Sequence, residues 1–452
     1  MNKDEMMGTM PVGKLIWVLA IPTILAQVIN ALYNIVDRIY LGHIPTNGAL
    51  ILTGVGLTYP IITLIAAFAQ LVGAGGAPLA AISLGSGNKE KAEKIMSQGF
   101  FILIIIAILL TILFQVFKRP LLFMFGASNA TITYAENYLS IYLLGTIFVQ
   151  VCLGMNLFIS SQGFASHAMT TVLIGAVLNI ILDPIFIFIF NMGEKGAALA
   201  TIISQAVSAL WVIRFLSSKT SILNLNFKHM LPSWKILTPV LALGVSPFIM
   251  NATEAAINIV FNSTLQRTGG DYAVGTMTII SSIMSFCWMP VSGFSQGSQP
   301  IISYNFGAGN NDRVRQTFRI LLITLLIYTF TFMALLELFP SVAIGIFTSD
   351  KALSEYAVPY LRIYFAGIGI FGLQMACQQA FLGLGQAKIS MFLALLRKVF
   401  LLIPLVLILS RTALGVTGAF LAEPISDITS ALVAITLFSL NFGKILKKGV
   451  QK

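Results

Sequence analysis

The sequence predicts an all-α polytopic membrane protein with twelve transmembrane helices in two parallel six-helix bundles. Three observations lead to this fold class. The chain has 452 residues, of which 57% are hydrophobic and 10% charged, whereas soluble domains carry about 25% charged residues. The apolar runs are long and unbroken, unlike the segments of about ten alternating residues of an outer-membrane barrel. Finally, the second half of the chain repeats motifs of the first.

Twelve apolar runs are long enough to cross the hydrocarbon core, which takes about 20 helical residues. We expect them at residues 14–40, 51–83, 98–117, 131–160, 168–190, 196–215, 236–264, 273–303, 317–339, 355–382, 389–409 and 416–440. Several of these runs exceed a straight crossing, so tilt or bends at Gly and Pro must absorb the excess. We expect no cleavable signal peptide, because residues 15–29 lead on without a small-residue cleavage site.

The internal repeat appears as matched motifs at one fixed spacing. The matched pairs, each 222 residues apart, are Gly87 and Gly309, Tyr138 and Tyr360, Gly163 and Gly385, and Gly196 and Gly418. Six spans per half give both halves the same orientation, related by a pseudo-two-fold axis along the membrane normal. We therefore expect an N-terminal bundle at 1–216, a cytoplasmic linker at 217–235 and a C-terminal bundle at 236–452. This architecture is typical of transporters that rock around a central site.

The basic residues explain the net charge of +11 through topology, so we expect no nucleic-acid partner. Sixteen basic residues fall on the loops of one side and six on the loops of the other. By the positive-inside rule the richer side is cytoplasmic, so we expect both termini on the cytoplasmic side of the plasma membrane. The basic loops would also attract the anionic lipid of that membrane. The sixteen are Lys3, Lys14, Lys89, Lys91, Lys94, Lys219, Lys228, Lys235, Arg313, Arg315, Arg319, Lys388, Lys444, Lys447, Lys448 and Lys452.

One acid interrupts the fifth span. Asp183 stands in the almost wholly apolar segment 178–190 and is followed by Pro184. An acid there costs roughly 2.5–3.5 kcal/mol and by default marks a pathway for ions or substrate. Asn179 falls on the same helix face, and Pro184 cannot bond the carbonyl of Ile180. Carboxylate, amide and carbonyl oxygens are the ligands of a hard cation. The alternative is a kinked helix whose acid is tied to a neighbouring hydroxyl.

Other polar residues of the N-terminal half could share this site. Asp37 in the first span has Tyr33 and Asn34 on its face, although it could instead lie near the outer surface and be solvated. Thr201 in the sixth span could face Asp183, or serve in helix packing. Tyr138 could hydrogen-bond an acid of a neighbouring helix, or be structural like its repeat partner.

The C-terminal half carries a rival set of charges. Glu254 in the seventh span, with Asn251 and Asn258 on its face, is either a second protonation or cation site or part of a cavity wall. Glu423 and Asp427 share a face of the twelfth span. Arg397 and Lys398 are their expected partners, in a structural cluster or in a cation-attracting cavity wall. Met284 and the other methionines of this half either adapt to apolar ligands or pack the core.

The sequence has no motif for ATP binding, metal binding or nucleophilic catalysis. The chain has no phosphate-binding loop, no Cys/His metal cluster and no nucleophile motif, and its three cysteines lie in apolar runs. We therefore expect neither an enzyme nor a cofactor. An energised process must then draw on an ion gradient, with H⁺ or Na⁺ as the coupling ion.

Three segments carry a family resemblance. Residues 21–42 (IPTILAQVINALYNIVDRIYLG), 179–188 (NIILDPIFIF) and 196–201 (GAALAT) closely resemble the multidrug and toxic compound extrusion (MATE) family. The similarity covers about residues 10–440. It implies a secondary active antiporter that exports cationic amphipathic drugs in exchange for H⁺ or Na⁺ by alternating access, and we expect a monomer. The alternative is an exporter or flippase of a specific endogenous metabolite or lipid-linked saccharide.

The resemblance also implies site residues. In one branch of the family, acids of the first and fifth helices form a cation site, which maps onto Asp37 and Asp183. The family's accompanying residues map onto Asn179, Thr201, Tyr138 and Tyr33, and Na⁺ would take Asp37, Asn179, Asp183 and Thr201. Another branch uses a glutamate at the place of Glu254, but its acid in the tenth helix has no counterpart in residues 361–382. This difference favours the N-terminal site and leaves open whether there are one or two.

Overall fold

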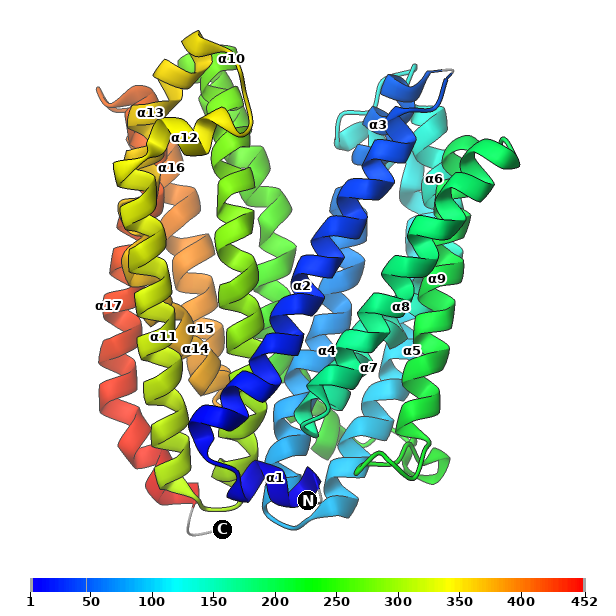
Figure 1. Cartoon of the computed structure of the whole chain (residues 1–452), viewed down its shortest axis with the longest axis vertical. Helices are drawn as coiled ribbons and strands as arrows, with labels where there is room; N and C mark the ends of the chain where they lie inside the picture. Colours follow the sequence, from blue (N-terminus) through cyan, green and yellow to red (C-terminus); the bar gives the residue numbers. More distant parts are fainter. Residues whose placement is uncertain (1–2, 46, 450–452) are drawn as a thin grey trace.

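The computed structural model describes residues 3–45 and 47–449 and consists of helices and their connections over this part of the chain. Two helical bundles stand side by side, in contact at the lower end of the view and diverging toward the upper end (Figure 1). We call them the N half, which ends with α9, and the C half, which begins with α10. The predicted all-α class is confirmed.

The N half runs from α1 to α9. A bend of 58° between α6 and α7 divides the fourth predicted span at Gly145, where a side chain would collide with Ile202. The fifth span contains a π-helical turn, η1, directly after Pro184. The elements are α1 (Lys3–Thr9), α2 (Val12–Gly42), α3 (Gly48–Gly56), α4 (Tyr59–Gly85), α5 (Lys89–Met124), α6 (Ile132–Leu144), α7 (Thr146–Ser161), α8 (Ala165–Pro184), η1 (Ile185–Ile189) and α9 (Gly193–Leu216).

The C half follows a connection that contains the short 3₁₀ helix η2. Its fifth span again contains a π-helical segment, η3. The elements are η2 (Phe227–His229), α10 (Trp234–Gly307), α11 (Asn311–Leu338), α12 (Pro340–Gly345), α13 (Lys351–Phe365), α14 (Ile368–Gly383), α15 (Ala387–Leu395), η3 (Leu396–Leu402), α16 (Ile403–Leu409) and α17 (Gly415–Gly449). The predicted linker thus corresponds to the segment between Leu216 and Trp234, and Lys452 lies outside the described residues.

Helix α10 is a hairpin of two membrane-length arms. Gly270 has φ 64° and ψ −156°, which interrupts the helix at its middle. Both ends of α10 lie against α4. A Cβ added to Gly75 would come within 2.1 Å of the Val240 carbonyl oxygen, and one added to Gly307 within 1.9 Å of the Ile82 carbonyl oxygen. The chain therefore reverses at Gly270, and α10 supplies two crossings.

The number of crossings agrees with the prediction once this hairpin is counted. The described residues contain 10 helices long and apolar enough to cross a membrane, or 11 when the bent pair α6–α7 is one span. Counting α10 twice raises the 11 by one and gives the twelve predicted spans in the predicted order. Six crossings then precede the connection at η2 and six follow it.

The two halves meet through close helix contacts at the lower end. The Thr23 hydroxyl of α2 donates to the Gly293 carbonyl of α10 at 2.6 Å. Arg313 of α11 reaches the other half, where its guanidinium donates to the carbonyl oxygens of Met7 (3.1 Å) and Met10 (2.8 Å). The charge-assisted bonds and the close backbone approach hold this end closed.

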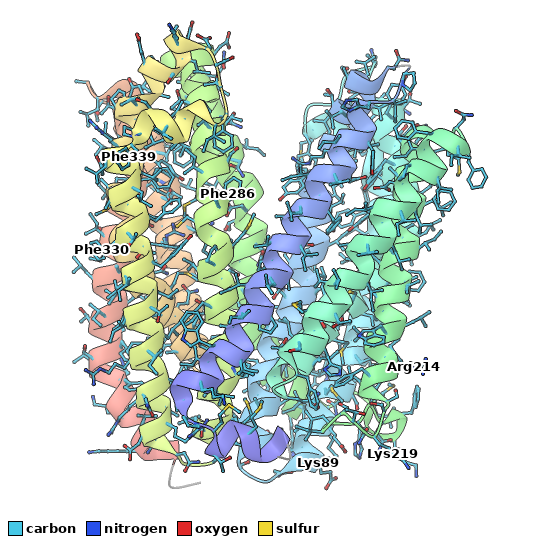
Figure 2. All side chains as sticks on the ribbon, viewed as in Figure 1. Lys89, Arg214, Lys219, Phe286, Phe330 and Phe339 are labelled. Carbon is cyan, nitrogen blue, oxygen red and sulfur yellow. The ribbon has the colours of Figure 1, made fainter. Side chains whose placement is uncertain are left out.

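The closed end also carries basic residues. Figure 2 shows Lys89, Arg214 and Lys219 at the lower end, whereas Phe330 of α11 and Phe339, directly after α11, lie at higher levels. The chain ends lie at this same lower end (Figure 1). The grouping agrees with the side to which the positive-inside rule assigned Lys89 and Lys219.

Candidate functional site

The N half brings the two acids predicted within its spans together. Asp37 lies near the C-terminal end of α2, and Asp183 lies at the end of α8. Asp183 is fully buried and Asp37 is partly buried. Their carboxyl groups lie close enough to each other to interact electrostatically. The structure thus places side by side two acids that are 146 residues apart in the chain.

Asn179 and Thr201 complete this cluster. The Asn179 amide donates to Asp183 Oδ1 at 3.2 Å and lies 3.4 Å from Thr201 Oγ1. Thr201 donates its own proton to the Ala197 carbonyl at 3.0 Å, so its oxygen keeps a free lone pair toward the amide. The helical spacing that put Asn179 and Asp183 on one face of the fifth span is realised, and α9 supplies the hydroxyl.

Three oxygen atoms of this cluster are buried without a hydrogen-bond partner among the described residues. They are Asp37 Oδ1, Asn179 Oδ1 and Asp183 Oδ2. Buried polar atoms are normally satisfied, so each such exception calls for an explanation. A proton bound between the acids or a small cation would satisfy them, and two carboxylates with amide and hydroxyl oxygens are a donor set that fits Na⁺. The described residues hold no cluster of three or more His, Cys, Asp and Glu side chains that would suit a transition metal.

Two tyrosines border the acids. The Tyr138 hydroxyl is within hydrogen-bonding reach of Thr201, and its ring stacks on Tyr142 with centroids 6.2 Å apart. The Tyr33 hydroxyl lies close enough to Asp37 to interact with its charge. Asn34 is exposed and donates to the Asn30 carbonyl at 2.6 Å. Tyr33 and Tyr138 therefore form part of the wall of the cluster, whereas the amide of Asn34 is engaged by its own helix.

The π-helical turns in the fifth and eleventh spans were not foreseen. In the N half the turn follows Asp183 and Pro184 directly, and in the C half it contains Arg397 and Lys398. Such bulges frequently occur at functional sites, because the extra residue rotates the side chains around it. The missing N–H of Pro184 was the one sequence feature that indicated a disturbed helix there.

The C half pairs its buried acids with a cation of its own. Arg397 is buried, and its guanidinium donates to Asp427 at 2.7 Å and to Glu423 at 2.9 Å. The same group lies 4.7 Å from the ring centroid of Phe371, and the Ser426 hydroxyl donates to the Arg397 carbonyl at 2.8 Å. The Arg397 side of the expected cluster is therefore present as a buried, charge-paired triad.

Lys398 has a different partner from the one expected. Its ammonium contacts the Glu254 carboxylate of α10 rather than Glu423 or Asp427. Adjacent helical residues point about 100° apart, so Arg397 and Lys398 cannot both face α17. Glu254 therefore carries a tethered counter-ion, unlike the two acids of the N half.

The remaining candidates of the C half lie around this pair. Asn251 donates to the Pro247 carbonyl at 2.8 Å. Asn258 lines a polar cavity of about 280 Å³ between the arms of α10. Met284 is partly buried against the core of the C half and does not line that cavity. Asn258 thus lines the cavity, whereas Asn251 and Glu254 are exposed outside its lining.

Comparison with known proteins places both halves in one family. The MatE sequence model matches residues 22–185 and 247–408, one stretch in each half. Multidrug export protein MepA of Staphylococcus haemolyticus (strain JCSC1435) is 24% identical over 416 residues, which is 92% of this chain and 91% of that protein. MepA of Staphylococcus aureus (strain NCTC 8325 / PS 47) is 24% identical over 430 residues, 95% of this chain and 94% of that protein.

Solved structures share the fold over the whole chain. A structure described as MATE in the bent conformation has a TM-score of 0.92 at 22% identity and covers 100% of this chain and 99% of its own. An outward-facing multidrug resistance MATE family transporter has a TM-score of 0.90 at 23% identity, with coverages of 97% and 98%. At this identity the likeness establishes the architecture, including the two repeated six-helix halves.

Proposed function

The chain belongs to the MatE family, and from this premise we propose that it is a secondary active antiporter that exports cationic amphipathic compounds in exchange for H⁺ or Na⁺. The family consists of transporters rather than enzymes. The relatives described above are named multidrug export proteins, which supports drugs and other toxic compounds as the cargo.

The observation that carries the coupling proposal is the acid pair of the N half. Among the described residues, neither Asp37 nor Asp183 forms a salt bridge with Lys or Arg, and each leaves one buried oxygen without a hydrogen-bond partner. Two carboxylates so close repel each other, and a bound proton or Na⁺ relieves that repulsion. A cationic cargo competes for the same negative charge. Ion and cargo therefore exclude one another, which is the thermodynamic requirement for exchange.

Alternating access requires the closed end to open. The contacts that hold it are the Thr23–Gly293 bond and the bonds from Arg313 to the α1 segment. With both termini in the cytoplasm, as proposed from the basic loops, the closed end is cytoplasmic and the cargo leaves where the bundles diverge. Each coupling charge that crosses 100 mV supplies about 2.3 kcal/mol, which is enough to drive such exchange.

Ethidium efflux from drug-sensitive cells tests the coupling site. Cells carrying wild type, Asp37→Asn or Asp183→Asn are compared at equal membrane expression, with and without Na⁺ and with a protonophore. We expect efflux to fall at least tenfold in both variants, because each loses the charge that holds the ion. Glu254→Gln tests the C half in the same assay, and Glu355→Gln, at an exposed acid of α13, is the matched control.

The outcomes separate the alternatives. If both N-half variants pump normally and only Glu254→Gln fails, the coupling site lies in the C half instead. The response to Na⁺ or to the protonophore identifies the ion. If wild type moves no ethidium although it is well expressed, a dedicated endogenous substrate replaces the multidrug proposal.

A further inference from the structure

The inner wall of the C half carries a polar groove next to the Glu254–Lys398 ion pair. Amide and hydroxyl side chains line the groove, although both arms of α10 are membrane-length helices. The lining residues are Asn258, Asn262, Thr278, Ser281, Ser282 and Ser285, around a volume of about 280 Å³. Glu254 stands one helical turn before Asn258, on the same side of the first arm.

Helical register shows that the groove faces the N half. On the first arm, Val240 and Gly244 lie against α4. Steps of three, four or seven residues continue that face to Glu254, Asn258 and Asn262. On the second arm, Gly293 lies against α2, and its face continues to Ser282 and Ser285. Both faces therefore extend upward from the contact between the halves into the region where the bundles diverge (Figure 1).

The ion pair is accessible from one side. The Glu254 side chain is 52% exposed, whereas the Lys398 side chain is 12% exposed. A ligand in this region can therefore reach the Glu254 carboxylate directly. The ammonium of Lys398 lies behind it, in the π-helical segment that also holds the buried Arg397.

A simple cation gains little at this pair. To bind Glu254 it must displace the ammonium of Lys398, which would be left in a mostly buried position without a counter-ion. Removing one partner of such a pair is strongly unfavourable, because it leaves an uncompensated charge. A ligand that brings both a cationic and an anionic group avoids this cost. Its anionic group pairs with Lys398, and its cationic group pairs with Glu254.

We propose that Glu254, Lys398 and the groove of α10 form a zwitterion subsite, which selects cargo molecules bearing a carboxylate beside their cationic group. The groove serves the neutral part of such a molecule. The hydroxyls of Thr278, Ser282 and Ser285 donate to carbonyls of their own helix and so offer lone pairs to a ligand. The volume suits a portion of a drug-sized molecule rather than all of it, because complete ligand pockets are about 300–1,000 Å³.

This subsite differs from the acid pair of the N half, which has no cation and suits monocations. The inference rests on the proposed export function, because the groove is a cargo site only in a protein that exports such compounds. It makes a separate prediction, however: loss of the Lys398 ammonium lowers the affinity for a zwitterion but not the affinity for a matched monocation.

Two fluorescent dyes with the same ring system test this ratio. Rhodamine 110 carries a free carboxylate beside its cationic xanthylium ring, and rhodamine 123 is its methyl ester and therefore a monocation. Binding is measured by fluorescence anisotropy on the purified full-length protein in lipid nanodiscs, without an ion gradient. In Lys398→Met we expect the affinity for rhodamine 110 to fall at least tenfold, while the affinity for rhodamine 123 stays equal or rises.

Two further variants keep the test independent of folding. Lys388→Met removes an exposed lysine of α15, close in the chain to the pair, and should change neither affinity. The double variant Glu254→Lys with Lys398→Glu restores the pair with reversed order, so rhodamine 110 should regain most of its affinity. If Lys398→Met lowers the affinity for both dyes equally, or lowers neither affinity, the proposal of a zwitterion subsite is wrong.

The same assay separates this inference from the coupling proposal. In proteins carrying Asp37→Asn or Asp183→Asn, adding Lys398→Met should still weaken rhodamine 110 binding at least tenfold, even where the N-half substitution abolishes efflux. A wild-type protein that binds rhodamine 110 no better than the Lys398→Met variant contradicts the subsite whatever the efflux result. Normal selectivity in a protein that shows no ion-coupled efflux would instead contradict only the antiport.

Discussion

The two halves share one fold but handle charge inside the membrane in opposite ways. In the N half, Asp37 and Asp183 approach each other, and neither forms a salt bridge within the described part of the chain. In the C half, Arg397 binds both Glu423 and Asp427, and Lys398 binds Glu254. A permanently bonded guanidinium competes with any mobile cation. The comparison therefore supports the proposal that ion exchange takes place in the N half, where the acids have no tethered counter-ion.

The difference lies in the side chains and in where the helix is interrupted. Both halves contain a π-helical segment in the fifth helix, but the segment of the C half comes earlier in that helix than the segment of the N half. At the repeat spacing of 222 residues, Thr201 corresponds to Glu423, and Asp183 corresponds to Leu405. Each half thus carries an acid at one of these two positions, Asp183 in the N half and Glu423 in the C half. The basic residues that neutralise the C half come from η3, where the N-half counterpart of Arg397 is Gly175.

The largest effect expected from this comparison is on stability, at Arg397. Arg397→Met leaves Glu423 and Asp427 buried together without a cation, and breaking a buried charge network costs about 3–5 kcal/mol. We expect a large drop in the thermal unfolding temperature of the detergent-solubilised protein and poor membrane expression. Asp183→Asn should instead leave the unfolding temperature unchanged or raise it, because it removes a charge that has no basic partner.

Two further variants check the source of that loss. Arg214→Met removes an exposed arginine of α9 and should leave the unfolding temperature close to wild type. Arg397→Met combined with Glu423→Gln and Asp427→Asn should recover part of the stability, since no buried charge is then left unpaired. Equal unfolding temperatures for Arg397→Met and wild type would mean that the C-half network is not a structural element.

How well the sequence predicts a feature of the fold or of the site depends on how far apart in the chain the interacting residues are. The twelve spans follow from hydropathy, and the alignment of Asn179 with Asp183 follows from helical spacing alone. The approach of Asp37 to Asp183 depends on packing between α2 and α8, and only the family resemblance pointed to it. The pairing of Lys398 with Glu254 was missed, because it joins residues 144 apart and depends on the rotation introduced by η3.

The π-helical turns explain most of the contacts that the sequence did not predict. One extra residue in a helical turn hardly changes the hydropathy or the apolar periodicity of the sequence. It does change the face of the helix on which the following side chains lie. Pro184 indicated the turn in the N half. In the C half, Pro404 follows η3 rather than preceding it, and therefore gave no equivalent indication of where the helix widens.

A second prediction removes the difference between the halves by giving the N half a cation. Asn179→Lys places a tethered ammonium beside Asp183, as Lys398 stands beside Glu254. The ammonium should occupy the place of the coupling ion, and we expect gradient-driven ethidium efflux to fall at least tenfold. Folding should be retained, because the two neighbouring carboxylates compensate the new buried charge.

Asn179→Met is the matched control for this substitution. Its side chain is nearly as long and unbranched but brings no charge, so it separates the effect of the ammonium from that of size and of the lost amide. The expected order of efflux is wild type, then Asn179→Met, then Asn179→Lys. A Lys variant that pumps at the wild-type rate and still responds to the gradient would show that the cluster does not hold the ion.

The smallest effect concerns the hydroxyl of Thr201. Thr201→Val keeps the shape of the side chain but removes the oxygen that lies 3.4 Å from the Asn179 amide. Losing one such bond costs about 1 kcal/mol, which corresponds to roughly fivefold weaker binding of the coupling ion. We expect the Na⁺ or H⁺ concentration for half-maximal efflux to rise by about that factor, with the maximal rate preserved. Thr201→Ser should restore the wild-type value.

Ser208→Ala provides the comparison within the same helix. Ser208 also lies on α9 and also faces α8, where its hydroxyl donates to the Thr171 carbonyl at 3.1 Å. Its loss removes a helix–helix hydrogen bond of similar size but no oxygen of the acid cluster. The unfolding temperature should therefore fall slightly while the ion dependence of efflux stays at the wild-type value. If both substitutions shift the ion dependence equally, Thr201 acts through the packing of α9 on α8 rather than through the bound ion.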